Sequence, residues 1–212
     1  MTAATITPRL VTALDAAWAR IRELHPDVPE VVITMASGSA ITRRKTAGQL
    51  LGHFAAARWQ RGAVQLPELF VSGEGLGRGA RDVLGTLLHE AAHGLAHARQ
   101  IKDTTRQGRW HNARYRDLAR ELGLDVAQAP GIGWSDTTLA TGTAREYAAV
   151  LRRLDAALVA FRHAEFRGRG RASSNNLLVA QCACPRKIRA SATVLAAGPI
   201  TCSRCGDDFT AS

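Results

Sequence analysis

One short motif, His89-Glu90-Ala91-Ala92-His93, restricts what this chain can fold into more than any other feature. Residues four apart lie on the same face of an α-helix, so His89 and His93 can point at a single metal ion. Glu90 is one residue round from His89. There it is near the metal without being needed as a ligand, and it can take a proton from a metal-bound water. The motif therefore predicts a catalytic zinc site on a helix.

The residues around the motif indicate that this helix is buried. A solvated helix with two surface histidines is the alternative, and it would need no apolar stripe. A buried histidine needs a polar or metal partner, so burial favours the metal site. The apolar positions are Leu84, Leu87, Leu88, Ala91 and Leu95.

The third metal ligand has two candidates. A catalytic zinc ion usually takes three protein ligands and keeps one position open. His97 is nearest in sequence, but eight residues of helix separate its backbone from that of His89 by about 12 Å. His111 follows a polar break at residues 103–108, which lets the chain fold back, and we expect it to open the next helix with Tyr115 on the same face. We therefore predict His89, His93 and His111 as the ligands.

Four cysteines near the end of the chain predict a second metal site. They form two close pairs separated by residues 185–201, a spacing typical of structural zinc sites. About 35 residues cannot build a stable core, so a metal ion would supply the missing folding energy. Two disulfides, or free thiols, are the alternatives. The predicted ligands are Cys182, Cys184, Cys202 and Cys205.

The periodicity of the chain predicts a mixed α+β fold. Helices are expected at 8–24, 80–101, 110–123 and 143–161, the last with a capping box formed by Thr143 and Glu146. Strands are expected within 28–37, 48–60 and 66–77, paired in antiparallel fashion because their linkers are short. Residues 129–142 are expected to be a loop with at most one short strand. Between the cysteine pairs, residues 187–201 alternate like a hairpin.

The charge of the chain predicts a polyanionic partner. The formal net charge is +10, and residues 162–212 hold eight basic residues against Glu165, Asp207 and Asp208. Phosphate contacts are the natural explanation, so we expect nucleic acid, DNA in particular, to bind this basic region. A solvated linker without a partner is the alternative. No segment approaches about 18 uninterrupted apolar residues and no signal peptide is evident, so we expect a cytoplasmic protein, nucleoid association included, without a membrane partner.

The segments "LLHEAAHGLAH" and "GRWHNARYRDLAREL" resemble the SprT-like (Spartan-related) zinc metallopeptidases. Members of that family carry H-E-x-x-H on one helix and a third histidine at the start of a following helix, which here corresponds to His111. The resemblance implies a zincin-like fold, with helices packed on a small, mainly antiparallel sheet, over residues 1–161. It also implies a zinc ribbon at 177–212. Residues 162–176 are basic and rich in Gly, Ser and Asn, so we expect them to form a linker before the ribbon. The implied substrates are proteins bound or crosslinked to DNA.

Two functional hypotheses follow from these features. The first is a zinc-dependent peptidase with Glu90 as its general base and two Zn2+ ions, one catalytic and one structural. The second is a nucleic-acid-binding zinc protein or regulator in which the histidine site is not proteolytic. The presence of Glu90 favours the peptidase, because a purely structural site does not need a base.

Overall fold

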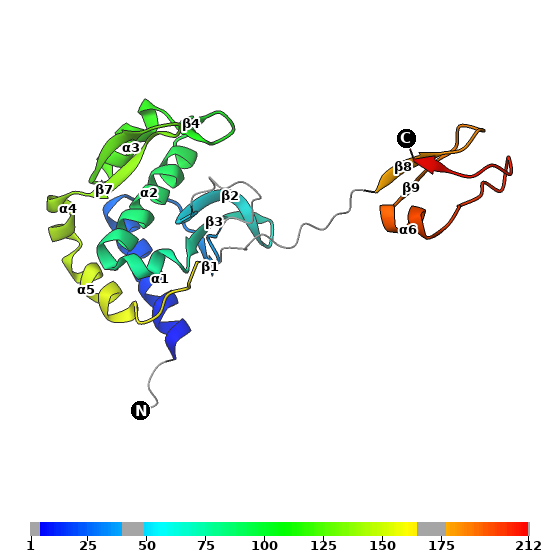
Figure 1. Cartoon of the computed structure of the whole chain (residues 1–212). Coiled ribbons are helices and arrows are strands. Elements are labelled where there is room, and N and C mark those ends of the chain that lie inside the picture. Colours follow the sequence, from blue (N-terminus) through cyan, green and yellow to red (C-terminus); the bar gives the residue numbers. More distant parts are fainter. Residues whose placement is uncertain (1–4, 40–48, 165–176, 212) are drawn as a thin grey trace. The chain divides into compact units, whose positions relative to one another are not determined.

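The computed structural model of the chain describes residues 5–39, 49–164 and 177–211 (Figure 1). The chain divides into two compact units, Met1–Phe166 and Arg167–Ser212. This division falls inside the segment 162–176 that the sequence predicts as a linker, and most of that segment lies outside the described residues. Each unit contains helices and strands, so the predicted α+β class is confirmed at this level.

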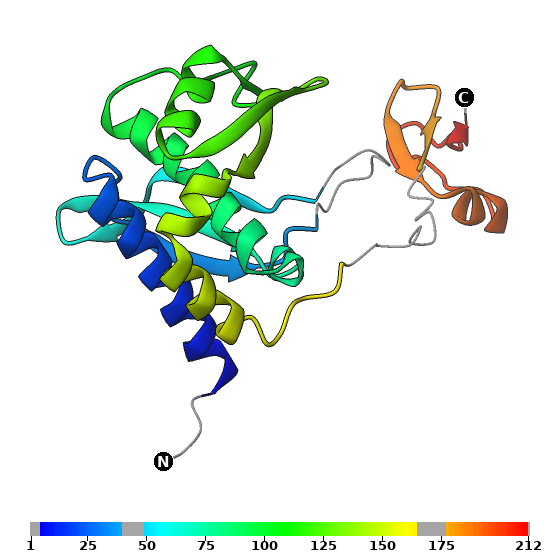
Figure 2. The same cartoon turned by 90° about the vertical axis from the view of Figure 1, so that its left-hand side faces the viewer.

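Helix α2 (Ala80–Ala98) is the central element of the first unit. Leucine and alanine cover most of its circumference, and a helix that is apolar on nearly all sides belongs in the interior. It contacts α1 (Ile6–Leu24), α3 (Ala113–Glu121) and α5 (Ala148–Ala157), as well as strands of both sheets (Figure 1). Helices α1 and α5 lie side by side and close the core (Figure 2). The fully buried side chains of α2 include Leu84, Leu87, Leu88, Ala91, Ala92 and Leu95.

The first sheet has three strands, β1 (Val32–Ala36), β2 (Gly52–Arg61) and β3 (Val64–Ser72), in the order β1-β3-β2. Strands β2 and β3 form the predicted antiparallel hairpin. The predicted antiparallel pairing of β1 is wrong, because β1 runs parallel to β3 and does not neighbour β2. The long connection from β1 to β2 permits this crossover, whereas the tight β2–β3 turn enforces antiparallel pairing. A 3-10 turn, Gly75–Arg78, then leads into α2.

The second sheet was largely missed by sequence reasoning. The sequence predicts residues 129–142 as a loop with at most one short strand, and the structure has a strand there that pairs with residues 124–129 to form a hairpin. The helix predicted from Trp110 begins only at Ala113. Asn112 accepts hydrogen bonds from the backbone N–H groups of Arg114 and Tyr115, and this cap fixes the start of α3. His111 is therefore on a strand. The strands are β4 (Thr104–Thr105), β5 (Trp110–His111), β7 (Gly133–Leu139) and β6 (Leu124–Ala129), in that order across the sheet.

The single helix predicted from Thr143 to Phe161 is also wrong. The structure has two helices in this region, α4 (Thr141–Glu146) and α5, which are separated at Tyr147, and α5 ends at Ala157. The Thr143 hydroxyl does not cap a helix but donates a hydrogen bond to the carbonyl of Gly123. This long-range contact is invisible in the local pattern and outweighs the capping box there.

The second unit contains β8 (Leu178–Gln181), β9 (Lys187–Ala190), α6 (Ala192–Ala197) and β10 (Thr210–Ala211). Strand β9 pairs with β8, and the predicted second arm of a hairpin is the helix α6, whose first turn is capped by the Ser191 side chain. The buried apolar side chains of this unit are few and small. Among its described residues they are Ala180, Cys182, Ala190 and Cys202.

Two further properties, one of the described helices and one of the sheets, complete the description of the fold. None of them is long and apolar enough to cross a membrane. The sheets of the first unit are both mixed, since β1 runs parallel to β3 and β5 runs parallel to β7. The expectation of one mainly antiparallel sheet is therefore replaced by two small mixed sheets on either side of α2.

The turn at Gly123 provides a test of this packing. Gly123 has φ +81° and lies against the Thr143 side chain, whereas Gly131 has the same φ of +81° with open space around it. Alanine in the left-handed region costs about 1–2 kcal/mol at either site, and overpacking at Gly123 adds about 1–3 kcal/mol. We expect Gly123→Ala to lower the free energy of unfolding clearly more than Gly131→Ala in urea denaturation. Equal losses would contradict the close packing of Thr143 on this turn.

Candidate metal centres

Three histidines from two elements converge beside α2. His89 and His93 lie one turn apart on α2, and β5 brings His111 against them. Each offers a ring nitrogen, and these atoms lie within 4.8 Å of one another. His97, the other candidate, lies apart from this group with its ring 5.8 Å from that of Phe54. The structure thus brings together the three histidines that the sequence singled out.

Hydrogen bonds orient two of the imidazoles so that Nε2 is the free nitrogen. Nδ1 of His93 lies 2.6 Å from the Asp103 carboxylate, and Nδ1 of His111 lies 3.2 Å from the Ile132 carbonyl. Both partners can only accept, so each Nδ1 carries the proton. In a neutral imidazole, Nε2 then holds a lone pair. Nδ1 of His89 is similarly 3.0 Å from the Thr137 hydroxyl.

The facing lone pairs explain why this site fits a cation. Nε2 of His93 and Nε2 of His111 are 3.2 Å apart. Two unprotonated nitrogens at this distance repel each other unless a positive charge lies between them. A tetrahedral zinc ion with nitrogen ligands at 2.0–2.1 Å would hold two of them about 3.3 Å apart. The donor set and its spacing therefore fit a metal ion, and imidazole ligands with oriented Nδ1–H groups are typical of zinc centres.

Burial favours the neutral, metal-binding form of the His89 and His111 imidazoles. Loss of solvent lowers the pKa of His89 well below its usual value, and the neighbouring His93 and His111 lower it further. Burial also lowers the pKa of His111. For Asp103, burial acts to raise the pKa, but the hydrogen bond and charge of His93 outweigh it and the net pKa is lowered. Metal binding requires neutral imidazoles, and the lowered pKa values of His89 and His111 favour that form.

The ring of Tyr115, on α3, packs against all three histidines of the triad. Its side chain is fully buried, and its ring centroid lies 5.0, 4.7 and 4.5 Å from those of His89, His93 and His111. The hydroxyl donates a weak hydrogen bond of 3.4 Å to the backbone carbonyl of His89. Burial raises the pKa of Tyr115 well above its usual value, so the phenol stays neutral. This ring fixes the distance between α2 and β5.

Glu90 lies beside the triad with only 5% of its surface exposed. Burial raises its pKa to about 7, while the charge of His93 and a hydrogen bond from the Phe54 backbone oppose the shift. A cation held by the histidines would lower this pKa again, toward the carboxylate form. Strand β2 approaches closely here, since a Cβ at Gly52 would lie 3.0 Å from Oε1 of Glu90.

A cleft of about 400 Å³ opens over these groups. Its floor includes His89, Glu90 and His111, and its walls come from the segment before β2, from the start of α2 and from β7. Leu50 and Ile132, which line opposite stretches of wall, are each 46% exposed. The cleft thus gives a large, partly apolar molecule access to Glu90 and to the triad.

Three residues of this centre escaped sequence reasoning, namely Asp103, Ile132 and Thr137. Asp103 was noted only as the start of a polar break, and the other two lie in a segment predicted to be mostly loop. An aspartate ten residues after a motif histidine carries no periodic signal. The pairing of β5 with β7 brings Ile132 to His111, and the packing of β7 on α2 brings Thr137 to His89.

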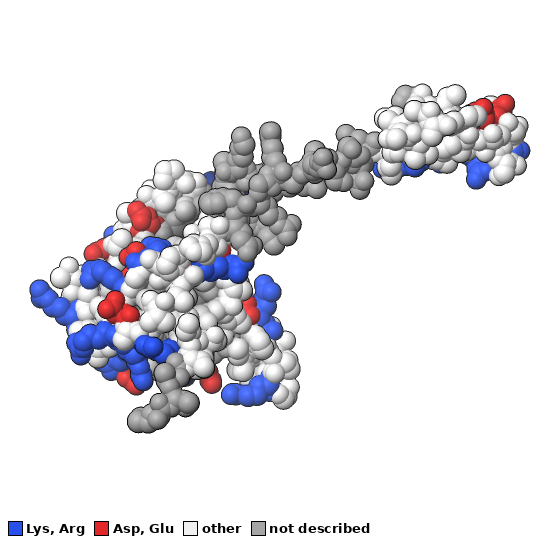
Figure 3. Space-filling view, turned by 60° about the horizontal axis from the view of Figure 1, so that its bottom comes forward, with Lys and Arg blue, Asp and Glu red and all other residues white. Residues whose placement is uncertain are grey.

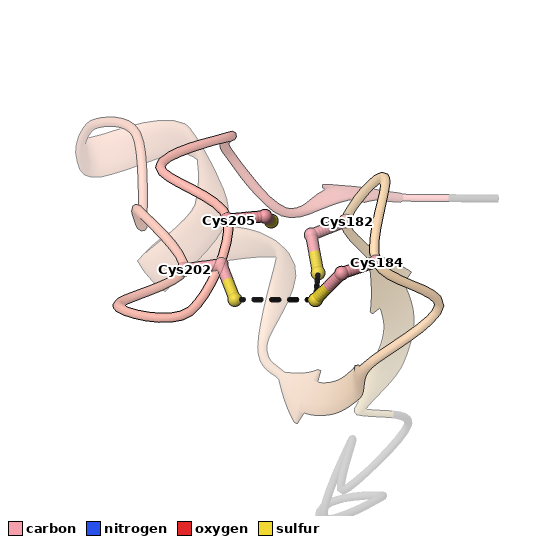
Figure 4. Close-up of side chains that lie close together, drawn as sticks. All are labelled: Cys182, Cys184, Cys202 and Cys205. Atoms are coloured by element: carbon pink, nitrogen blue, oxygen red, sulfur yellow. Dashed lines mark hydrogen bonds between the residues drawn. The ribbon is translucent and has the colours of Figure 1, made fainter.

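The second centre consists of the four cysteines (Figure 4). Residues 182–184 lie between β8 and β9, and residues 202–205 lie in a turn closed by a hydrogen bond from the Gly206 N–H to the Cys202 carbonyl. The Sγ–Sγ distances are 3.3 Å for Cys182–Cys184 and 3.7 Å for Cys184–Cys202. Disulfide sulfurs lie about 2.05 Å apart, and two sulfurs on one tetrahedral zinc ion lie about 3.8 Å apart. The four cysteines are free, and their spacing fits a metal ion.

The surroundings of the cysteines also favour bound metal. Backbone N–H groups of Arg204 and Cys205 donate to Cys202 and lower the pKa of its thiol to about 6. The Arg186 guanidinium donates a further hydrogen bond of 3.5 Å to the same sulfur. By contrast, a hydrogen bond with the neighbouring Cys182 thiol raises the pKa of Cys184 to about 12, because that bond favours the protonated form. A divalent cation relieves this conflict by allowing all four sulfurs to ionise.

Comparison with known proteins identifies no relative of this chain: protein-family models, curated proteins and solved structures gave no match. The function of the protein must therefore be inferred from the chemistry of the two centres. The resemblance to SprT-like metallopeptidases stays a hypothesis that rests on the histidine motif, His111 and the cysteine pairs.

We expect metal content to follow the ligand sets. Purified protein should hold two metal ions per chain, and His111→Ala should lose one of them while His97→Ala keeps both. Asp103→Asn should weaken metal affinity at the histidine centre about 10- to 100-fold, because the amide no longer accepts strongly from His93. Elemental analysis and chelator competition measure these effects, with Asp117→Asn as the control at an exposed carboxylate. Full metal retention in His111→Ala would contradict the proposed triad.

Proposed function

We propose that the first unit is a zinc-dependent peptidase of the H-E-x-x-H type, related to the SprT-like metallopeptidases. The observation that carries the proposal is a buried carboxylate, Glu90, beside three imidazoles whose ring nitrogens converge. Glu90 and two of these imidazoles, His89 and His111, line one cleft. A structural metal site needs no base and no cleft. A hydrolytic site needs both.

The roles of the residues follow from their positions. A zinc ion, when bound, supplies a Lewis acid that makes a water molecule acidic near neutral pH. Glu90 accepts the proton of the attacking water and passes it to the leaving amine, and a carboxyl whose pKa lies near neutrality suits both transfers. His89, His93 and His111 hold the metal. Asp103, Thr137 and the Ile132 carbonyl keep their rings oriented.

The proposed substrates are proteins bound or crosslinked to DNA. The resemblance suggests this class, and charge supports it. Basic side chains outnumber acidic ones in the chain, and the face of the first unit drawn in Figure 3 shows the same excess. In the second unit the proposed zinc ribbon carries Arg186, Lys187, Arg189 and Arg204 around its four cysteines. Phosphate contacts by such residues would hold the peptidase near its substrate.

The Glu90→Gln variant tests catalysis. The change keeps size and shape but removes the base, so the variant should retain both metals, fold normally and bind DNA, yet show no cleavage. A positioned base is typically worth about a hundred- to ten-thousand-fold in rate. Cleavage of a DNA-bound protein is measured by electrophoresis, with the exposed residue Glu23 changed to Gln as the control.

Two results would overturn the peptidase proposal. One is Glu90→Gln activity equal to that of the wild type, which would place the activity elsewhere. The other is tight DNA binding by a metal-loaded wild type that cleaves no DNA-bound protein. That second result would favour a nucleic-acid-binding zinc protein whose histidine centre is not proteolytic.

Truncation tests the role of the second unit. We expect a chain that ends at Phe166 to lose most salt-sensitive, sequence-independent DNA affinity, because it lacks seven basic residues and only two acidic ones. This end point keeps the backbone N–H of Arg162, which donates to the carbonyl of Gly73, so the first unit stays intact. Binding by anisotropy, with a matched melting curve, is the measurement. Unchanged affinity would mean that residues 167–212 do not bind DNA.

A further inference from the structure

Two tryptophan–arginine pairs lie on the sheet that carries His111. The guanidinium carbon of Arg106 lies 4.6 Å from the ring centroid of Trp110, and that of Arg116 lies 5.0 Å from the centroid of Trp134. Both tryptophans are half-buried, so part of each residue reaches solvent. A planar cation already rests on each indole, which shows that a flat group can be accommodated there.

The two pairs are neighbours in the fold. Trp110 and Trp134 belong to the paired strands β5 and β7, which meet at His111 and Gly133. The Trp110 ring runs across Gly133, where an added Cβ would lie 3.0 Å from a ring atom. Glycine at this position lets the indole cross the neighbouring strand. The aromatic faces therefore form part of one surface beside the metal centre.

This surface is strongly basic. Residues 102–120 contain six basic and two acidic residues. Of the two acidic ones, Asp103 is engaged by His93, and Asp117 lies 2.7 Å from Arg116, so that arginine is already paired. Arg106 and Arg109 are exposed, and within the described part of the chain neither has a carboxylate within 4.0 Å. Their charge is available to a partner.

The hairpin between β4 and β5 holds Arg106 in place at an energetic cost. Arg106 and Gln107 have φ of +52° and +59°, a conformation that side chains rarely adopt, and Gly108 follows with φ +82°. Non-glycine residues keep this strained conformation only where the surrounding structure holds them in it. The turn projects two arginines from a short hairpin next to His111.

We propose that Trp110, Trp134, Arg106, Arg109 and Arg116, here named the Trp–Arg surface, bind single-stranded nucleic acid beside the metal centre. Bases stack on the indoles, Arg106 and Arg109 contact the phosphates, and Arg116 supports the Trp134 ring. Unpaired bases are the ligand that combines flat apolar faces with a regular negative charge. A duplex offers the charge alone, and an acidic peptide lacks the stacked rings. This site is distinct from the basic second unit and does not depend on the peptidase proposal.

The hairpin β2–β3 provides a matched control from the same unit. It also carries a tryptophan, Trp59, with 42% exposure. Carboxylates neutralise that hairpin, however. The Trp59 indole donates to Glu68 at 3.0 Å, and Arg61 lies 3.8 Å from Glu30. We therefore expect no nucleic-acid contact there.

The test uses the full-length chain and fluorescein-labelled oligothymidylate of about a dozen nucleotides. Anisotropy should show that Trp110→Ala with Trp134→Ala weakens binding at least about tenfold, whereas Trp59→Ala leaves it unchanged. Phenylalanine at both positions should restore part of the affinity, because it still stacks. Arg106→Gln with Arg109→Gln should reduce the slope of log affinity against log salt concentration by about two, because each arginine contributes about one phosphate contact. Metal content and melting temperature verify that each variant is folded.

Intrinsic fluorescence assigns the signal to the first unit, since residues 167–212 contain no tryptophan. Saturating oligothymidylate should quench the wild type and Trp59→Phe alike. Absence of quenching would overturn the proposal, as would wild-type affinity in the double alanine variant. Equal weakening of single-stranded and duplex binding in that variant would also overturn it, because stacking on unpaired bases predicts a selective loss.

Discussion

The geometry of the histidine centre in the first unit depends on the repulsion between the unprotonated imidazole nitrogens of His93 and His111. Asp103 and the Ile132 carbonyl accept hydrogen bonds from Nδ1–H of His93 and His111, so that the two Nε2 lone pairs face each other at 3.2 Å. A fold holds such a pair only if a cation offsets the repulsion and the surroundings leave the rings no other position. Burial of α2 and the Tyr115 ring supply that rigidity. The geometry of the centre therefore fits a metal ion.

The second unit solves a different problem with the same chemistry. Its described residues bury few apolar side chains, so hydrophobic burial alone cannot hold two short hairpin strands and a six-residue helix together. Four sulfurs within 4.8 Å of one another provide the missing cohesion once they ionise around a cation. Metal binding and folding are then one equilibrium in this unit. In the first unit, by contrast, a full core surrounds the histidines.

The sheet formed by β4, β5, β7 and β6 carries residues of both the histidine centre and the Trp–Arg surface. One of its strands supplies His111, another supplies Thr137, and the tryptophans of the Trp–Arg surface alternate with these positions along the same strands. Successive side chains of a strand point to opposite faces. A sheet of this size can thus present metal ligands on one face and a basic aromatic surface on the other, within a few residues of each other.

The sequence by itself determined the features that depend on local spacing. The helices α1 and α2, the β2–β3 hairpin, the proximity of His89 and His93 and the two cysteine pairs follow from helical or short-loop geometry. His111 was chosen correctly as a neighbour of the motif, but for a partly wrong reason, since it lies on a strand. Tertiary structure alone decided the parallel pairing of β1, the break at Tyr147 and the positions of Asp103 and Thr137. Those features arise from contacts between segments far apart in the chain, and local periodicity carries no record of them.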